Sequence, residues 1–362
     1  AAQIIQGAIL RGDGLSAAMG AALLFGASVP LAKPLLAHTS PWMLAALLYL
    51  GSGVGLALLR VLRRQPLQAL QGTEWRWLAG AIVAGGMLGP VLLMLGLANM
   101  PAAHASLLLN AEGVLTALLA WVVFRENVDR HVALGMLVIV VGGLVLAWPA
   151  GGRSTLASET AALGLWPALA VIGACLAWAV DNNLTRKVSL SDASQIAMLK
   201  GLVAGATNLV IALALGATWP AAPLVGAAGL LGFLCYGASL TLFVVALRHL
   251  GTARTGAYFS VAPFLGAVLA VAWLGEPVTW PMALAGGLMA IGVALHLAER
   301  HEHPHTHTPQ RHTHAHRHDD GHHDHTHGAG EAGTGWHTHS HQHAVLTHAH
   351  AHFPDAHHRH TH

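Results

Sequence analysis

The chain has 362 residues, of which 54% are hydrophobic and 9% are charged, and its formal net charge is +2. An ordinary soluble domain is about 25% charged, so this composition excludes a soluble globular protein. The small net charge gives no reason to expect a nucleic-acid partner. Apolar runs of about twenty residues recur along most of the chain, which predicts an integral membrane protein.

Boundaries at proline, glycine and clusters of charge divide the apolar part into ten predicted membrane-spanning helices, so the predicted fold class is all-α. Each helix is close to the length that crosses about 30 Å of hydrocarbon. The connections are mostly short, which predicts that neighbouring helices are antiparallel. The predicted spans are 14–37, 41–60, 77–98, 102–124, 131–149, 163–185, 193–216, 223–247, 252–274 and 279–298.

Basic residues predict which side of the membrane each loop faces. With the N-terminus in the cytoplasm, one set of loops holds ten basic residues and the other holds only Arg153. Such an excess marks the cytoplasmic side. We therefore expect both termini in the cytoplasm, in the inner (plasma) membrane of a bacterium. The ten residues are Arg60, Arg63, Arg64, Arg76, Arg125, Arg130, Arg186, Lys187, Arg248 and Arg254.

The chain contains an internal repeat. Residues 104–143 align without a gap on residues 254–293, and Glu126 and Glu276 occupy the same position between helices. Each copy belongs to five predicted spans, and because five is odd, the two halves should have opposite topology. Inverted repeats of this kind are typical of alternating-access transporters. We expect a first repeat at 1–149, a linker loop at 150–162 and a second repeat at 163–298.

The repeated residues resemble a known family. Asn99–Gly143, with "VVFRENVD", and Gly251–Leu297, with "LGEPVT", are similar to the EamA domain of the drug/metabolite transporter superfamily. Phe25-Gly26 and Trp178-Ala179 resemble the aromatic-small pair in the first helix of each EamA repeat. The resemblance implies a secondary active exporter of a small polar metabolite such as an amino acid, with Trp178 near the central cavity.

Four charged residues fall within predicted spans, namely Lys33, Glu112, Asp181 and Lys200. A carboxylate at the centre of a membrane helix costs about 2.5–3.5 kcal/mol on insertion scales, so Glu112 should face the bundle interior or a watery cavity. We expect these residues to form a substrate or proton site. They could instead neutralise one another, or, for Lys33, Asp181 and Lys200, be polar groups near helix ends.

Trp178, Tyr258 and Ser260 complete the predicted substrate site. Tyr258 and Ser260 occupy the positions of the second copy that match Leu108 and Asn110 of the first. The chain has no nucleophile–base motif, so we expect no enzymatic activity. It also has no Gly-x-x-x-x-Gly-Lys-Ser/Thr run, so an ion or substrate gradient should drive transport.

The last part of the chain, 299–362, is a histidine-rich tail. It has too few apolar residues to form a core, so we expect it to be disordered and cytoplasmic. Neutral imidazole is a ligand for zinc, nickel, cobalt and copper ions, which predicts metal binding of low specificity. No cofactor is required. The predicted ligands are His301, His303, His305, His307, His312, His314, His316, His318, His322, His323, His325, His327, His337, His339, His341 and His343.

Two alternatives to a metabolite transporter remain open. One is an efflux transporter of divalent transition metal such as nickel, cobalt or zinc, with the tail collecting ions at the cytoplasmic mouth. The other is a membrane-bound metal sensor without transport. The expected partners are a small-molecule substrate, the lipid bilayer and metal ions, and the protein could be a monomer or a homodimer.

Overall fold

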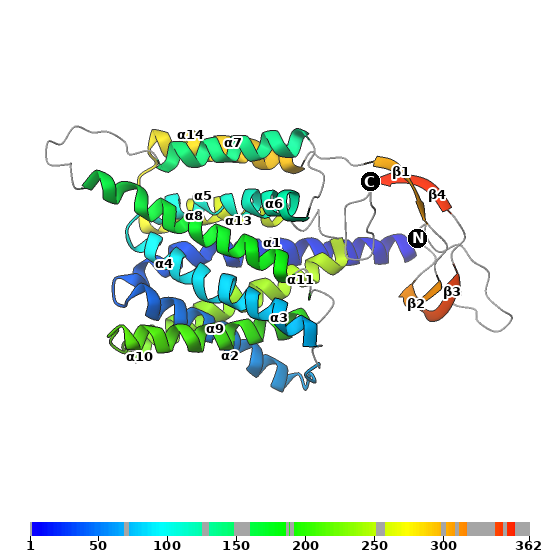
Figure 1. Cartoon of the computed structure of the whole chain (residues 1–362), viewed down its shortest axis with the longest axis horizontal. Coiled ribbons are helices and arrows are strands. Elements are labelled where there is room, and N and C mark those ends of the chain that lie inside the picture. The colour runs from blue at the N-terminus through cyan, green and yellow to red at the C-terminus, as the bar shows by residue number, and fades with distance from the viewer. Residues whose placement is uncertain are drawn as a thin grey trace. The chain divides into compact units, whose positions relative to one another are not determined.

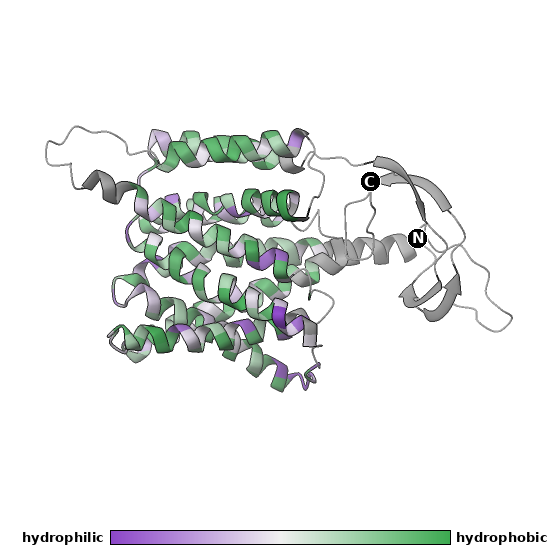
Figure 2. Ribbon diagram, in the orientation of Figure 1, coloured by the Kyte–Doolittle hydropathy of each residue, from purple (hydrophilic) through white to green (hydrophobic). Residues whose placement is uncertain are grey.

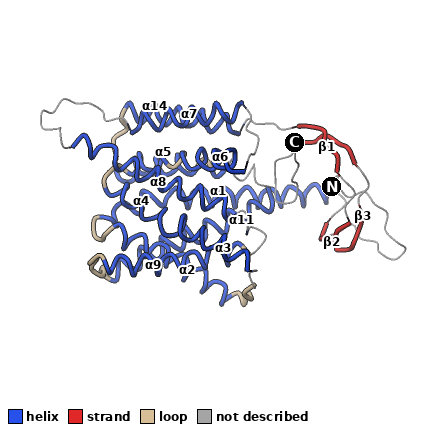
Figure 3. Tube along the Cα trace, viewed as in Figure 1, coloured by secondary structure: helices blue, strands red, loops and turns tan. Residues whose placement is uncertain are grey.

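The computed structural model describes residues 2–68, 72–124, 130–147, 160–185, 188, 192–250 and 258–297, and four short segments of the tail. The chain divides into two units, Ala1–Glu299 and Arg300–His362. The first unit is a bundle of helices and the second contains strands (Figures 1 and 3).

The described part of the first unit is helical. Seven of its helical segments are long and apolar enough to cross a membrane, which confirms a multi-pass arrangement. Three further apolar helices are shorter and correspond to the predicted spans 131–149, 252–274 and 279–298, so the number ten stays a prediction. The elements are α1 (Ala2–Leu36), α2 (Pro41–Leu62), α3 (Gly72–Ala81), the π-helix η1 (Ile82–Leu88), α4 (Gly89–Ala98), α5 (Ala102–Leu108), α6 (Ala111–Phe124), α7 (Arg130–Ala147), α8 (Thr160–Thr185), α9 (Ala193–Ala214), α10 (Ala222–Gly232), the π-helix η3 (Phe233–Ala238), α11 (Ser239–Leu250), α13 (Ala262–Leu274) and α14 (Trp280–Leu297).

Three helices begin well before the sequence predicts. Helix α1 begins at Ala2 rather than at residue 14, α3 begins at Gly72 rather than at residue 77, and α8 begins at Thr160, inside the predicted linker 150–162. These extensions are short of apolar residues compared with the spans that follow them, so hydropathy alone does not include them. The structure thereby shortens the predicted linker at its C-terminal end.

The helices pack in pairs drawn from the two halves of the chain. Helix α2 packs against α9, α7 against α14, α1 against α11 and α4 against α8, and these helices run in similar directions in Figure 1. Hydrophobic residues cover most of their length (Figure 2). The α2–α9 contact is close because Gly53 lies against the backbone of Gly201 and Leu202, where a Cβ would overlap it. Small residues allow such an approach between membrane helices.

The predicted span 102–124 is broken into α5 and α6 by a turn at Leu109–Asn110. The Asn110 side-chain Nδ2 donates to the Leu107 carbonyl oxygen at 2.9 Å, and the Asn110 backbone N–H donates to the same oxygen at 3.1 Å. A short polar side chain that binds nearby backbone in this way competes with helix continuation. The break puts Glu112 in the first turn of α6, so the expectation that Glu112 lies mid-helix is corrected.

The third helix of each half contains a π-helical stretch, η1 between α3 and α4 and η3 between α10 and α11. A π-helix shifts the backbone hydrogen bonds by one residue, and such stretches are rare and frequently lie at functional sites. Gly85 is the fourth residue of η1 and Tyr236 is the fourth residue of η3. The two stretches therefore correspond to each other.

The tail contains four strands, where the sequence predicts disorder. They are β1 (Glu302–His307), β2 (Arg311–His316), β3 (His337–Gln342) and β4 (Leu346–Ala351). Strand β1 pairs with β4 and β2 pairs with β3, both antiparallel. The correction has a local cause: threonine recurs between the histidines, and β-branched residues favour extended backbone. Backbone pairing needs no apolar core, which was the only criterion behind the prediction of disorder.

Candidate functional site

An ion pair lies inside the helix bundle. Lys200 Nζ, on α9, is 2.6 Å from both carboxylate oxygens of Asp181, on α8. The two side chains are 13% and 9% exposed. The Thr185 hydroxyl, one turn further along α8, donates to Asp181 Oδ1 at 2.8 Å. Of the four charged residues predicted within spans, these two neutralise each other, as one alternative from the sequence suggested.

Gly85 of η1 lies directly against this ion pair. A Cβ at this position would overlap the Asp181 carboxylate, so only glycine leaves room for it. The Gly85 carbonyl oxygen accepts two hydrogen bonds, from the Tyr49 hydroxyl at 2.8 Å and from Trp178 Nε1 at 3.0 Å. The π-helical backbone thus presents a carbonyl group to side chains of α2 and α8 at the level of Asp181.

Glu112 is bonded to an amide rather than to a lysine. Asn182 Nδ2, on α8, donates to Glu112 Oε1 at 2.9 Å. The first turn of α6 also favours a negative charge, because its backbone N–H groups carry the positive end of the helix dipole. Two neighbouring residues of α8, Asp181 and Asn182, therefore bind one partner each, on α9 and on α6.

Aromatic rings form one side of the site. The Phe25 ring centroid is 6.4 Å from that of Trp178, 6.2 Å from that of Tyr236 and 5.3 Å from that of Phe259. The Tyr49 and Tyr236 centroids are 5.6 Å apart. Trp178, which the family resemblance put near the centre, therefore joins rings from both halves of the chain.

Lys33 belongs to a different cluster. Its Nζ donates to the carbonyl oxygens of Leu97 and Met100, at 2.6 and 2.9 Å. Across the same connection, the Glu276 carboxylate accepts the backbone N–H groups of Ala102 and Ala103, at 2.7 and 2.8 Å. A cation at the C-terminal end of α4 and an anion at the N-terminal end of α5 both match the helix dipole. Lys33 thus holds a helix connection together instead of binding Asp181.

Tyr258 and Ser260 precede α13. Tyr258 is 36% exposed, and Ser260 lies in the turn at 260–261. Their neighbour Phe259 is the residue that contacts the ring cluster, through Phe25 and through Phe243 at 4.8 Å. The residues of the described contacts that the sequence did not single out include Tyr49, Asn182 and Tyr236. Tyrosine was a usable signal, because the chain has only three tyrosines and two of them join the cluster.

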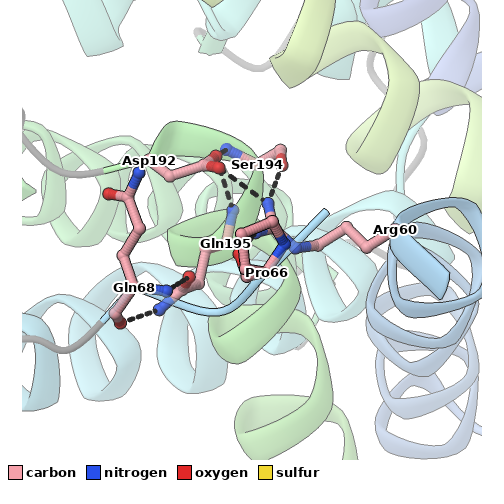
Figure 4. A network of polar contacts seen from close by, with 6 residues as sticks. All are labelled: Arg60, Pro66, Gln68, Asp192, Ser194 and Gln195. Atoms are coloured by element: carbon pink, nitrogen blue, oxygen red, sulfur yellow. Dashed lines mark hydrogen bonds and ion pairs between the residues drawn. The ribbon is translucent and has the colours of Figure 1, made fainter. Parts of the chain in front are cut away.

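A second polar network connects the ends of α2 and α9 (Figure 4). Arg60 Nη1 is 2.8 Å from Asp192 Oδ2 and 2.5 Å from the Ser194 hydroxyl, and Nη2 donates to the Pro66 carbonyl at 2.8 Å. Gln195 exchanges two hydrogen bonds of 2.8 Å with the backbone of Gln68. Partial burial raises the Asp192 pKa, but hydrogen bonds from Arg60, Gln195 and Ser194 outweigh it and hold the pKa below its ordinary value.

An apolar groove of about 480 Å³ lies elsewhere, between α2 and the α10–η3 segment. Glycine and aliphatic side chains line it, among them Gly51, Val54 and Leu230, together with Phe233. Val54 and Leu230 are more than half exposed on the outer surface of the bundle. The groove therefore carries none of the charged chemistry and faces the surroundings of the bundle.

Among the residues whose side chains are described, no group of three or more His, Cys, Asp or Glu is placed to hold a metal ion. Of the predicted tail ligands, nine histidines lie in the described strands and only their backbone is described. The others, His301, His318, His322, His323, His325, His327 and His343, lie outside the described residues.

An apolar bundle with charged groups paired in its interior is the architecture of a multi-pass membrane protein. Residues 13–148 and 165–298 match the model of the EamA-like transporter family, and the chain belongs to this family. It is 29% identical over 288 residues to an uncharacterized transporter of Methanothermobacter thermautotrophicus, covering 75% of this chain and 82% of that protein. A solved structure described as "Crystal structure of protein" has the same fold, with a TM-score of 0.58, 21% identity and coverage of 77% of this chain and 95% of that one.

Proposed function

We propose that the protein is a secondary active transporter that exports a small zwitterionic metabolite, such as an amino acid, by alternating access. The observation that carries the proposal is the Asp181–Lys200 ion pair inside the bundle. A zwitterion has the same two charges. Its ammonium group can bind Asp181 while its carboxylate binds Lys200, so that binding exchanges one paired arrangement for another and leaves no buried charge alone.

Alternating access requires two halves that can rock against each other around a central site. The reciprocal packing of helices supports two equivalent halves, because α1 of the first half packs against α11 of the second, and α8 of the second half packs against α4 of the first. The matching π-helices η1 and η3 support the same reading. We therefore propose ten spans arranged as two inverted repeats of five, with a predicted bacterial inner-membrane location and both termini in the cytoplasm.

Glu112 is proposed to couple transport to a proton. It is linked to the ion pair through neighbouring residues of α8, because Asn182 binds Glu112 and the preceding residue, Asp181, binds Lys200. Among the described residues, its side-chain hydrogen-bond partner is the uncharged amide of Asn182, so the carboxyl group can take up or release a proton without breaking an ion pair. Protonation at one side of the membrane and release at the other would then drive substrate movement in the opposite direction.

Flux measurements in liposomes test the substrate class. Purified protein is reconstituted and uptake is compared for radiolabelled zwitterionic amino acids, monovalent organic anions, monovalent organic cations and divalent nickel and zinc. We expect uptake of zwitterions only, and its loss in Asp181→Asn. Preference for a singly charged solute or a metal ion, or wild-type flux in Asp181→Asn, would contradict the proposal.

A second proposal concerns the tail, which we infer to bind divalent transition metal. The specific support is the strand register. In the β2–β3 pair, His312, His314 and His316 are the Cα partners of His341, His339 and His337, in that order. In the β1–β4 pair, His303 and His305 are the partners of His350 and His348. Directly opposed residues of an antiparallel pair are neighbours, and imidazole is a common ligand of such metals.

The register leads to a stoichiometric test on the full-length protein. If opposed histidines share an ion, His314→Gln with His339→Gln removes one site, whereas His314→Gln with His341→Gln damages two. Equilibrium dialysis with nickel should then show that the second double variant loses about twice as many ions as the first. Equal losses would mean that the histidines bind without register, and no nickel binding by the full-length protein would exclude a metal role for the tail.

Truncation of the tail also distinguishes a metabolite transporter from a metal transporter and from a sensor. A chain ending at Arg300 keeps the whole helical unit, so it should still insert and transport a metabolite. If metal is the transported substrate instead, this truncation should raise the KM for nickel and leave kcat nearly unchanged. If the protein is a sensor, no solute should show flux with either form.

A further inference from the structure

Two hydroxyl groups are buried beside the ring cluster with no hydrogen-bond partner outside the pair that they form. Ser28, on α1, is 1% exposed, and neither its Oγ nor the Tyr236 hydroxyl oxygen has a well-formed hydrogen bond to any other described residue. The two hydroxyls lie next to each other, and a hydrogen bond between them uses only one of their two protons. Hydroxyls of Thr207 and Thr241 instead donate to the carbonyl four residues earlier in their own helix, at 2.8 and 3.0 Å. A buried hydroxyl that leaves this ordinary arrangement has bonding capacity for something else.

The ring of Tyr49 connects these hydroxyls to the surroundings of the ion pair. The Tyr236 ring contacts the Tyr49 ring, and the Tyr49 hydroxyl donates to the Gly85 carbonyl, which lies against Asp181. A second path runs through Phe25, whose ring contacts both Tyr236 and Trp178. The charged groups and the two hydroxyls therefore lie at opposite ends of one continuous set of rings.

The repeat places the two ends at corresponding positions. Asp181 follows Trp178 by three residues, and Ser28 follows Phe25 by three residues, where Trp178 and Phe25 are the matching aromatic residues of the two halves. Gly85 and Tyr236 are the fourth residues of the two π-helices. The contact between a carboxylate of the second half and a glycine of the first thus corresponds to a contact between a serine of the first half and a tyrosine of the second.

We propose that Ser28 and Tyr236 form the second half of the substrate site and select an uncharged, hydrogen-bonding group at the far end of the zwitterion. This inference rests on the proposed function. The described contacts of the two hydroxyls include no charged side chain, and a charge buried there would lack a counter-ion. A hydroxyl or carboxamide satisfies both hydroxyls, whereas an aliphatic end leaves them without partners. The favoured substrates are therefore small amino acids with such a polar end.

Matched solutes test this selectivity in liposomes. L-Asparagine and L-leucine have side chains of similar shape, but one ends in a carboxamide and the other in two methyl groups. The measured quantity is the ratio of their kcat/KM values. We expect the wild type to favour asparagine by about tenfold, the value of one to two hydrogen bonds, and we expect Tyr236→Phe and Ser28→Ala each to bring the ratio close to one. Thr207→Val, which removes a hydroxyl already bonded to its own helix, should keep the wild-type ratio.

The outcomes separate this inference from the proposed function. Flux of both amino acids with a wild-type ratio near one, or a ratio that Tyr236→Phe and Ser28→Ala leave unchanged, would overturn the role of the two hydroxyls while leaving zwitterion transport intact. No flux of any zwitterion would overturn the proposed function, and the specificity assignment with it. Because the ratio compares two solutes on one preparation, partial loss of folded protein in a variant does not alter it.

Discussion

Replacing Lys200 by methionine is expected to destabilise the protein more than any other single change of charge. Methionine keeps the length of the side chain and removes its charge, so Asp181 remains as a carboxylate that is 9% exposed. Among the described residues, Thr185 is then its remaining side-chain donor. Removing one partner of a buried pair costs about 3–5 kcal/mol, because an uncompensated charge is left behind.

The double variant separates stability from function. Asp181→Asn combined with Lys200→Met removes both charges, and uncharged replacements of a buried pair are often neutral. We therefore expect the double variant to be about 3 kcal/mol more stable than Lys200→Met alone, although it carries one more substitution. Transport should be lost both in Lys200→Met and in the double variant, since at least one charge of a zwitterion finds no partner in either.

Denaturant unfolding in detergent micelles measures the stabilities, and flux in liposomes measures transport. Lys33→Met is the matched control: it also removes a lysine charge, but its partners are carbonyl oxygens, so no opposite charge is left buried. We expect a smaller cost there, about 1.5–3 kcal/mol. A double variant no more stable than Lys200→Met would refute the buried-pair reasoning, and one that transports normally would remove the pair from the substrate site.

Three further predictions follow from single contacts. Gly85→Ala should abolish transport and lower stability because its Cβ overlaps the Asp181 carboxylate, whereas Gly287→Ala, with open space around it, should behave as wild type in both assays. Asp192→Asn should be less stable than wild type near neutral pH. This difference in stability should shrink as the pH falls below 3.8, the ordinary pKa of an aspartate, towards the lowered pKa of Asp192. A difference in thermal unfolding that stays constant with pH would argue against the Arg60 network. Glu276→Gln should cost about 1–2 kcal/mol, because a charged acceptor of two backbone N–H groups becomes a neutral acceptor of one, and an unchanged unfolding midpoint would show that the cap contributes nothing.

Membrane class and approximate helix positions could be predicted from the sequence, because both depend on local runs of apolar residues. The charged residues of the candidate site could be named for the same reason: a charge within such a run is conspicuous wherever the chain folds. The helix break at Leu109–Asn110 was missed because it contains no proline or glycine. A hydropathy pattern does not register an asparagine that binds its own backbone.

The state of the tail was predicted from its composition alone, and composition predicts disorder when apolar residues are few. Strand pairing there depends on which segments find each other in space. The pairing of β1 with β4 and of β2 with β3 joins parts of the tail that are distant in sequence. A periodic pattern has many possible registers, so the one adopted cannot be read from the pattern alone.

By itself, the sequence determined that this chain crosses a membrane repeatedly and carries two acidic and two basic groups within its spans. Only the tertiary structure decided that Lys200 meets Asp181, that Glu112 meets Asn182 and that Lys33 holds a helix connection. Those partners lie on different helices, and their meeting depends on how closely the helices approach. At Gly85 the approach is set by the absence of a single carbon atom and by a π-helical backbone, and neither effect changes the hydropathy of the chain.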